Sequence, residues 1–191
     1  MLLLAWALTR LCRNRTEDQA AGIAAEEALA AVEEALVTLP ETVPPQETTP
    51  TPNPEMPVAE IDGYGYVGYL ELPALELTLP VMSEWDYERL NIAPCRQFGS
   101  SRTDDLVIAA HNYYTHFGGL HTLTEGDSVR FTDMDGLCND YTVRDIRILD
   151  PTDLAAVRDS GYALVLYTCS YNGQNRVTVF CEREEAGLCN E

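Results

Sequence analysis

Cys169 and Arg176 are the two residues whose chemistry and spacing first suggest a reactive site. Cys169 ends an apolar, strand-like run, and Arg176 begins the next alternating run after a short polar loop that contains Gly173. If the two runs pair as a hairpin, the thiol and the guanidinium meet across that loop. A thiol attacks carbonyl carbon as the thiolate, which nearby positive charge favours, and arginine can stabilise a developing oxyanion. The spacing therefore predicts a cysteine-nucleophile active site.

A cysteine nucleophile needs a partner that moves protons, most often a histidine. His111 directly follows the apolar run 105–110, so we expect it to emerge from the end of a buried strand into a cleft. His116 and His121 follow in the next loop, and we expect both to be surface residues. Three loop histidines at this spacing match no common set of zinc ligands. We therefore expect no metal and no other cofactor.

Short alternating or apolar runs separated by turn residues dominate the chain after residue 60. They include 66–72, 75–81, 105–110, 128–132, 141–148 and the two runs that end at Cys169 and begin at Arg176. Asp135-Gly136 between two of these runs is a strong hairpin signal, and 83–90 and 150–157 are expected to be short helices. About eight short strands with regular turns predict an all-β barrel or sandwich.

The first 60 residues have a different composition. Residues 1–8 are apolar but too few to cross a membrane, which takes about 20 residues. They are either the apolar start of a helix or the tail of a membrane anchor whose beginning is missing, and we favour the anchor. The Ala/Glu-rich segment up to residue 38 predicts a helical stalk, and residues 39–60 a Pro/Thr-rich linker. The expected catalytic domain is 61–185, followed by a tail at 186–191.

Charge and cysteine content narrow the functional classes. The chain has 12 Lys+Arg against 31 Asp+Glu, a formal net charge of −19, which disfavours nucleic acid as a partner. None of the six cysteines forms a Cys-x-x-Cys pair, which argues against a zinc ribbon or a thioredoxin-type motif. A disulfide that involves Cys95, Cys138 or Cys181 stays open.

With these residues in place, the second domain resembles the sortase family, the transpeptidases of Gram-positive cell surfaces. The resemblance lies in Val107-Ile108-Ala109-Ala110-His111-Asn112, in Leu166-Tyr167-Thr168-Cys169, and in Arg176 after a short loop. It implies an eight-stranded barrel with the catalytic residues His111, Cys169 and Arg176 at one end. It further implies substrate contacts from the neighbouring residues Asn112, Tyr113, Thr168 and Tyr171.

The resemblance also implies a reaction, partners and a location. Cys169 would cleave a Leu-Pro-x-Thr-Gly-like sorting signal (LPxTG) through a thioester, and His111 would move the protons. The acyl group would pass to an amine of a peptidoglycan precursor or a pilin. The enzyme would sit on the extracellular face of a Gram-positive membrane, held by an N-terminal anchor. The sequence looks more like class B than class A, but 150–161 leaves little room for the class B helical insertion, so the subclass stays open.

Two other functions share parts of this pattern. A secreted cysteine protease would use the same nucleophile and base but release its acyl group to water. A surface-adhesion β module on a stalk would need no reactive thiol. Residues 39–43, Leu-Pro-Glu-Thr-Val, imitate a sorting signal apart from the final valine. One hypothesis is that they act as a weak pseudosubstrate, although we favour coincidence in a Pro/Thr/Glu-rich spacer.

Overall fold

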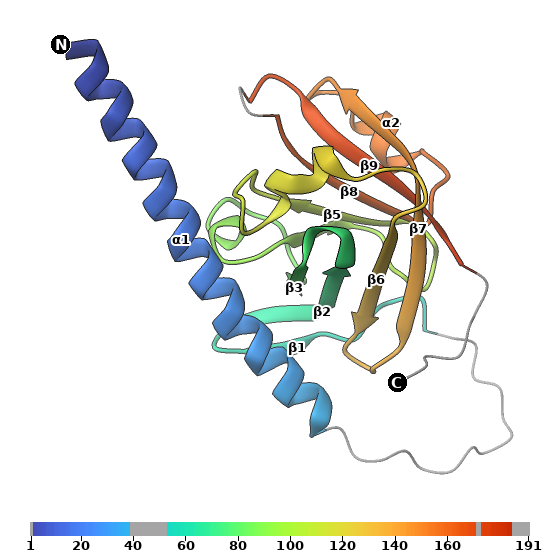
Figure 1. Cartoon of the computed structure of the whole chain (residues 1–191). Coiled ribbons are helices and arrows are strands. Elements are labelled where there is room, and N and C mark those ends of the chain that lie inside the picture. Colours follow the sequence, from blue (N-terminus) through green and yellow to red (C-terminus); the bar gives the residue numbers. More distant parts are fainter. Residues whose placement is uncertain (1, 39–52, 171–172, 185–191) are drawn as a thin grey trace, which may run out of the picture.

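The computed structural model describes residues 2–38, 53–170 and 173–184, with side chains from Cys12 onward (Figure 1). The helices are α1 (Leu2–Val37) and α2 (Leu154–Arg158), with 3-10 turns at Pro73–Leu75, Arg89–Asn91 and Phe117–Thr122. The strands are β1 (Ala59–Ile61), β2 (Tyr64–Leu72), β3 (Leu77–Met82), β4 (Cys95–Phe98), β5 (Leu106–Ala110), β6 (Ser128–Asp133), β7 (Cys138–Leu149), β8 (Leu164–Cys169) and β9 (Arg176–Arg183).

Eight of these strands close into a barrel. They follow the order β2-β3-β4-β5-β8-β9-β7-β6, and β6 pairs back onto β2, while the short β1 adds to the edge of β2. The sheet is mixed, because β3–β4 and β5–β8 are parallel and the other pairs are antiparallel. The predicted all-β, eight-stranded barrel with short helices and a preceding helix is confirmed.

Alternation along each strand separates the core from the outer face. Leu106, Ile108 and Ala110 of β5 point into the barrel with Leu164 and Leu166 of β8. The residues between them therefore face outward, which is why the ends of these strands can present polar groups. Barrel closure depends on Gly68, which has a φ of 146°. A Cβ there would lie 1.9 Å from the Thr132 carbonyl oxygen, so only glycine lets β2 approach β6 this closely.

Helix α1 lies along the barrel rather than ahead of it, as Figure 1 shows. Val32 is fully buried in a cluster with Tyr66 of β2 and Met82 of β3, and Ala21 and Ala25 are buried as well. The segment expected to be a helical stalk is thus helical and packs against the strands, because its small alanines allow a close approach. Among the described residues, no helix combines the length and the apolar character that crossing a membrane requires.

Several local predictions have clear outcomes. The hairpin around Asp135-Gly136 is confirmed as β6–β7, and the helix near 150–157 is α2, which the Asp153 side chain caps. The helix expected over 83–90 is only the 3-10 turn Arg89–Asn91, because the Asp86 carboxylate accepts from the Arg89 N–H and closes a local turn. Cys95 and Cys181 are buried free thiols and do not bond to each other.

Candidate active site

The hairpin of β8 and β9 brings Cys169 and Arg176 together. The two residues are the last paired partners of these antiparallel strands, directly opposite each other. Both side chains are partly exposed, and they alternate with the core residues Thr168 and Val177. The thiol and the guanidinium therefore share the outer face at one end of the sheet, as the sequence spacing predicted.

His111 reaches the same end of the sheet from the neighbouring strand. Strands β5 and β8 are parallel, and Ala110 pairs with Thr168, so His111 follows β5 at the level of Cys169. The Thr168 hydroxyl donates to the Ala110 carbonyl at 2.9 Å. This bond holds the two strands in register at the residues that directly precede Cys169 and His111. Thr168 is only 3% exposed. Its side chain thus does not face the substrate side, and its geometry suits a positioning role rather than the expected contact.

Arg176 carries no ion pair within the described part of the chain, although acidic residues greatly outnumber basic ones. Among the described residues, its side chain donates one hydrogen bond, from Nη1 to the adjacent Asn175 carbonyl at 3.3 Å. By contrast, eight other arginines pair with carboxylates: Arg13, Arg89, Arg96, Arg102, Arg130, Arg144, Arg147 and Arg183. The Arg176 guanidinium therefore keeps donors for a ligand oxygen.

Helix α1 forms one side of the His111 environment. Burial lowers the pKa of His111, and the negative charge of Glu17 on α1 opposes that shift. The ring of Tyr113 lies 4.8 Å from the His111 ring, centroid to centroid. A histidine in this setting is held mainly neutral while a nearby carboxylate favours its protonated form, which suits a group that both accepts and donates protons.

The loop after His111 is tied to the same helix by Asp18. The Asp18 carboxylate accepts from the backbone N–H groups of Tyr114 and Thr115 at 3.2 and 3.0 Å and from the Thr115 hydroxyl at 2.6 Å. The approach is close, because a Cβ on Gly22 would lie 2.8 Å from the Thr115 methyl carbon. No local sequence pattern links residues almost one hundred positions apart, so sequence reasoning does not place this helix at the site.

His116 is not the surface residue that we expected. It is fully buried, with the Tyr113 ring 5.7 Å away, and burial lowers its pKa to about 4, with the charge of His111 adding to the effect. The 3-10 turn Phe117–Thr122 draws the loop back over the barrel and carries His116 under it. His121 is exposed, as expected. No cluster of His, Cys, Asp or Glu among the described residues could hold a metal ion.

A cavity of about 180 Å³ opens beside Arg176 and forms the candidate substrate groove. Tyr167 lies on its floor two residues before Cys169, and its hydroxyl donates to Gln97 Oε1 at 2.7 Å. Burial raises the pKa of Tyr167 to about 12, so the phenol stays protonated. The remaining walls come from the loop before β4 and from the segment around α2: Trp85, Tyr87, Leu149, Asp150, Pro151, Asp153, Leu154 and Val157.

Sequence reasoning placed the groove only in part. Tyr167 could have been found from the strand period, since it shares a face with Cys169. Gln97 and Trp85 carried no local signal, because they reach the groove through strand order alone. Asn112 is exposed and donates from Nδ2 to the Ser170 carbonyl at 3.5 Å, and Tyr113 is partly buried beside His111. Tyr171 lies outside the described residues.

A family model named Sortase domain matches residues 70–184, well over half of the chain. The chain belongs to the sortase family. It is therefore a cysteine transpeptidase of the sortase type, and the predicted enzyme class is confirmed. Comparison with curated proteins gave no match.

Solved sortase structures share the fold. Sortase C1 of GBS pilus island 1 is 18% identical, with a TM-score of 0.66 over 87% of this chain and 95% of that one. Sortase C of Streptococcus pneumoniae is 19% identical, with a TM-score of 0.64 over 85% and 98%. Sortase C1 of Streptococcus agalactiae is 25% identical, with a TM-score of 0.57 over 66% and 72%. These neighbours are sortases C, so the leaning toward class B gains no support from them.

Proposed function

We propose that this sortase cleaves an LPxTG-like sorting signal through a thioester on Cys169 and transfers the acyl part to an amine. The observation that carries the proposal is the shared level of His111, Cys169 and Arg176 at the ends of β5, β8 and β9. Acyl transfer needs a nucleophile, a proton-transfer group and an oxyanion partner, and these three supply one each.

The first half of the reaction forms the thioester. The Cys169 thiol gives its proton to His111, its sulfur attacks the carbonyl carbon of the substrate threonine, and the carbonyl oxygen gains negative charge. Arg176 donates to that oxygen with the N–H groups that no carboxylate occupies. The C–N bond to the next residue then breaks, and His111 gives a proton to the leaving amine.

The second half reverses the proton movement. His111 takes a proton from an incoming amine, the amine nitrogen attacks the thioester carbon, and the C–S bond breaks to regenerate Cys169. Asn112 and Tyr113 beside His111 would contact the substrates near this centre, and Tyr171 remains a proposed contact. Thr168 would hold the register between β5 and β8 through its bond to Ala110.

The proposal includes an acceptor class and a subclass, and the solved neighbours support both. The Streptococcus pneumoniae structure is described as giving insights into pilin substrate specificity, and a Clostridium perfringens sortase C was solved with the C-terminal cell wall sorting motif. We assign this chain to the sortase C group, with a pilin or cell-wall amine as acceptor. The reaction would take place at the outer face of the cell membrane, where an N-terminal anchor would hold the enzyme.

A cleavage assay with and without an added amine tests the proposal. A peptide that contains Leu-Pro-Glu-Thr-Gly should be cut by the wild type, and triglycine or hydroxylamine should accelerate turnover and appear in the product. A secreted protease would instead yield the free acid at a rate that the amine does not change. The Cys169→Ala variant should form no thioester in intact-mass spectra, whereas Cys12→Ser, which removes an exposed thiol on α1, should form it normally.

A further inference from the structure

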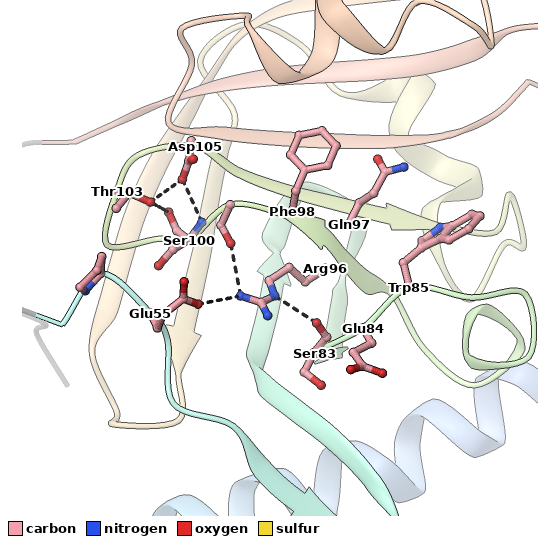
Figure 2. A pocket seen from close by; sticks show the side chains of 12 residues that line it. Glu55, Ser83, Glu84, Trp85, Arg96, Gln97, Phe98, Ser100, Thr103 and Asp105 are labelled. Atoms are coloured by element: carbon pink, nitrogen blue, oxygen red, sulfur yellow. Dashed lines mark hydrogen bonds and ion pairs between the residues drawn. The ribbon is translucent and has the colours of Figure 1, made fainter.

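A second and larger cavity, of about 660 Å³, adjoins the substrate groove (Figure 2). The two cavities share the lining residues Trp85 and Gln97. The cavity lies over β4 and the turn after it, and Arg96, Phe98 and Ser100 line it. None of its residues has a part in the proposed chemistry.

The strand register indicates which part of a bound peptide comes near this cavity. An extended chain rises about 3.3 Å per residue, so a four-residue acyl segment reaches about 13 Å from the thioester. Val165 lies four residues before Cys169 on β8. It pairs with Val107 of β5, and Val107 in turn pairs with Phe98 of β4. If the acyl segment runs back over β8 from Cys169, the first residue of the sorting motif comes level with Phe98, which lines the cavity.

Helix α2 blocks the direction in which such a peptide would continue along β8. Val157 of α2 packs with Val107 and Val165 on the outer face of the sheet. Arg158 stacks over the Phe98 ring, with 4.8 Å between the guanidinium carbon and the ring centroid. A peptide that continues beyond the motif must turn away from α2, and the open side is the cavity over β4.

Among the residues that line the cavity, the positive charge comes from Arg96, whose side chain is 21% exposed. Its Nε donates to the Ser83 carbonyl at 3.0 Å, and its Nη1 makes a long contact of 3.5 Å with the Gly99 carbonyl (Figure 2). The nearest carboxylate is that of Glu55, at 3.7 Å from Nη1, and the Glu55 side chain is 75% exposed. Glu55 is therefore the charged partner of Arg96 among the described residues, at a long distance and from a mostly exposed side chain.

The other two acids of the cavity are already engaged. Glu84 pairs with Arg89 at 3.4 Å, and Asp105 accepts from the Ser100 N–H at 2.9 Å and from the Thr103 hydroxyl. Neither carboxylate bonds to Arg96. A ligand carboxylate that reached Arg96 would thus have only the exposed Glu55 to displace, and charge-assisted bonds to arginine are stronger than neutral ones.

We propose that this cavity binds the residues immediately upstream of the sorting motif and selects an acidic side chain there through Arg96. Glu55 occupies the position of that carboxylate when no substrate is bound. The inference rests on the proposed function, because the direction of the peptide follows from thioester formation at Cys169. It adds a specificity element outside the four-residue motif.

Peptides that differ at one upstream position test the proposal. Each carries Leu-Pro-Glu-Thr-Gly after a Ser/Gly segment in which one of the two residues before leucine is Glu, Gln or Lys. For wild type we expect kcat/KM for the Glu peptide to exceed that for the Gln peptide about tenfold, chiefly through KM. The Glu-to-Gln ratio should fall to about one in Arg96→Gln, persist in part in Arg96→Lys and rise in Glu55→Gln.

The control is Arg144→Gln, which removes an exposed, ion-paired arginine of β7 and should keep the wild-type ratio. Equal rates for Glu and Gln peptides in wild type, or a ratio that survives in Arg96→Gln, would overturn the proposal. Binding of the same peptides to Cys169→Ala, measured by calorimetry, separates the two claims. Glu-dependent binding without cleavage by wild type would keep the cavity and reject the reaction, whereas cleavage without any Glu preference would do the reverse.

Discussion

The two sides of the active site are held in different ways. His111 sits at the end of β5 in a loop that a distant helix secures, through the bonds of Asp18 to Tyr114 and Thr115. Cys169 and Arg176 sit opposite each other on a hairpin of paired strands, and the Ser170 N–H donates to the Asn175 carbonyl at 2.8 Å within its loop. The proton-transfer side is thus fixed by tertiary contacts, and the nucleophile side by strand pairing.

This contrast predicts where substitutions act. Changes on the hairpin remove reacting groups directly, so they should lower the rate of chemistry most. Changes on the helix should act through the placement and charge of His111, with smaller effects on rate. The following predictions test that division.

Replacing the nucleophile should have the largest effect. Cys169→Ala is expected to lower peptide cleavage by at least about 10³-fold, since no other group can form the thioester. Burial raises the pKa of Cys95 and of Cys181 to about 12, so neither thiol can substitute. Iodoacetamide should inactivate the wild type, with the label on Cys169 in peptide mass spectra. Inactivation with that residue unmodified would contradict the assignment.

Arg176→Gln should lower kcat by about 10²- to 10³-fold, the range found when an oxyanion donor is lost. We expect KM for the peptide to change much less, because the charge that Arg176 stabilises develops after binding. Arg147→Gln is the matched control, since that arginine pairs with Asp145 on β7. Similar losses in both variants would mean that Arg176 acts only through overall charge.

His116 should make the helix-held side sensitive to acid. Its pKa falls from 6.5 to about 4 on folding, so the unfolded state binds the proton first and stability is lost as pH decreases from 6.5 toward 4. The loss attributable to this residue is about 2 kcal/mol at pH 5. Urea unfolding at pH 7.5 and at pH 5 measures the free energy of unfolding of the wild type and of His116→Leu. Between these pH values, the wild type should lose about 2 kcal/mol more than the variant. Parallel pH dependence of the two proteins would refute it.

Asp18→Ala should lower kcat about tenfold by releasing the loop that follows His111. Glu26→Ala removes an exposed carboxylate from the same helix and should leave activity unchanged. Asp18→Asn should recover part of the loss, because the amide oxygen can still accept from the loop N–H groups. If Asp18→Ala were fully active, the helix would have no role in placing His111.

Glu17→Gln should have the smallest effect. Removing this charge takes away the attraction that opposes the effect of burial, so the pKa of His111 should fall further. The midpoint of the His111 titration, measured by NMR, should move to lower pH. The limb of the pH profile of kcat/KM that reports His111 should move in the same direction. Movement of that limb to higher pH would contradict the assigned sign.

The strands and the hairpin pair were predictable because they follow from local alternation and from one turn. Cys169 and Arg176 meet across that turn, and His111 joins them because a parallel neighbour ends at the same level. His116 was misplaced because loop composition does not reveal that a 3-10 turn folds back over the barrel. Asp18, Gln97 and Trp85 were missed because only tertiary packing and strand order bring them to the site.

Because α1 packs on the loop that follows His111, we expect an active form of the enzyme to include this helix. The Pro-rich segment 39–52 separates two parts of the sequence that touch in space, so a boundary drawn at residue 61 would cut through the catalytic unit. We infer that a recombinant protein starting there would keep its nucleophile yet lose the support of its acid–base partner. The shortest fully active version should retain the helix from before Glu17.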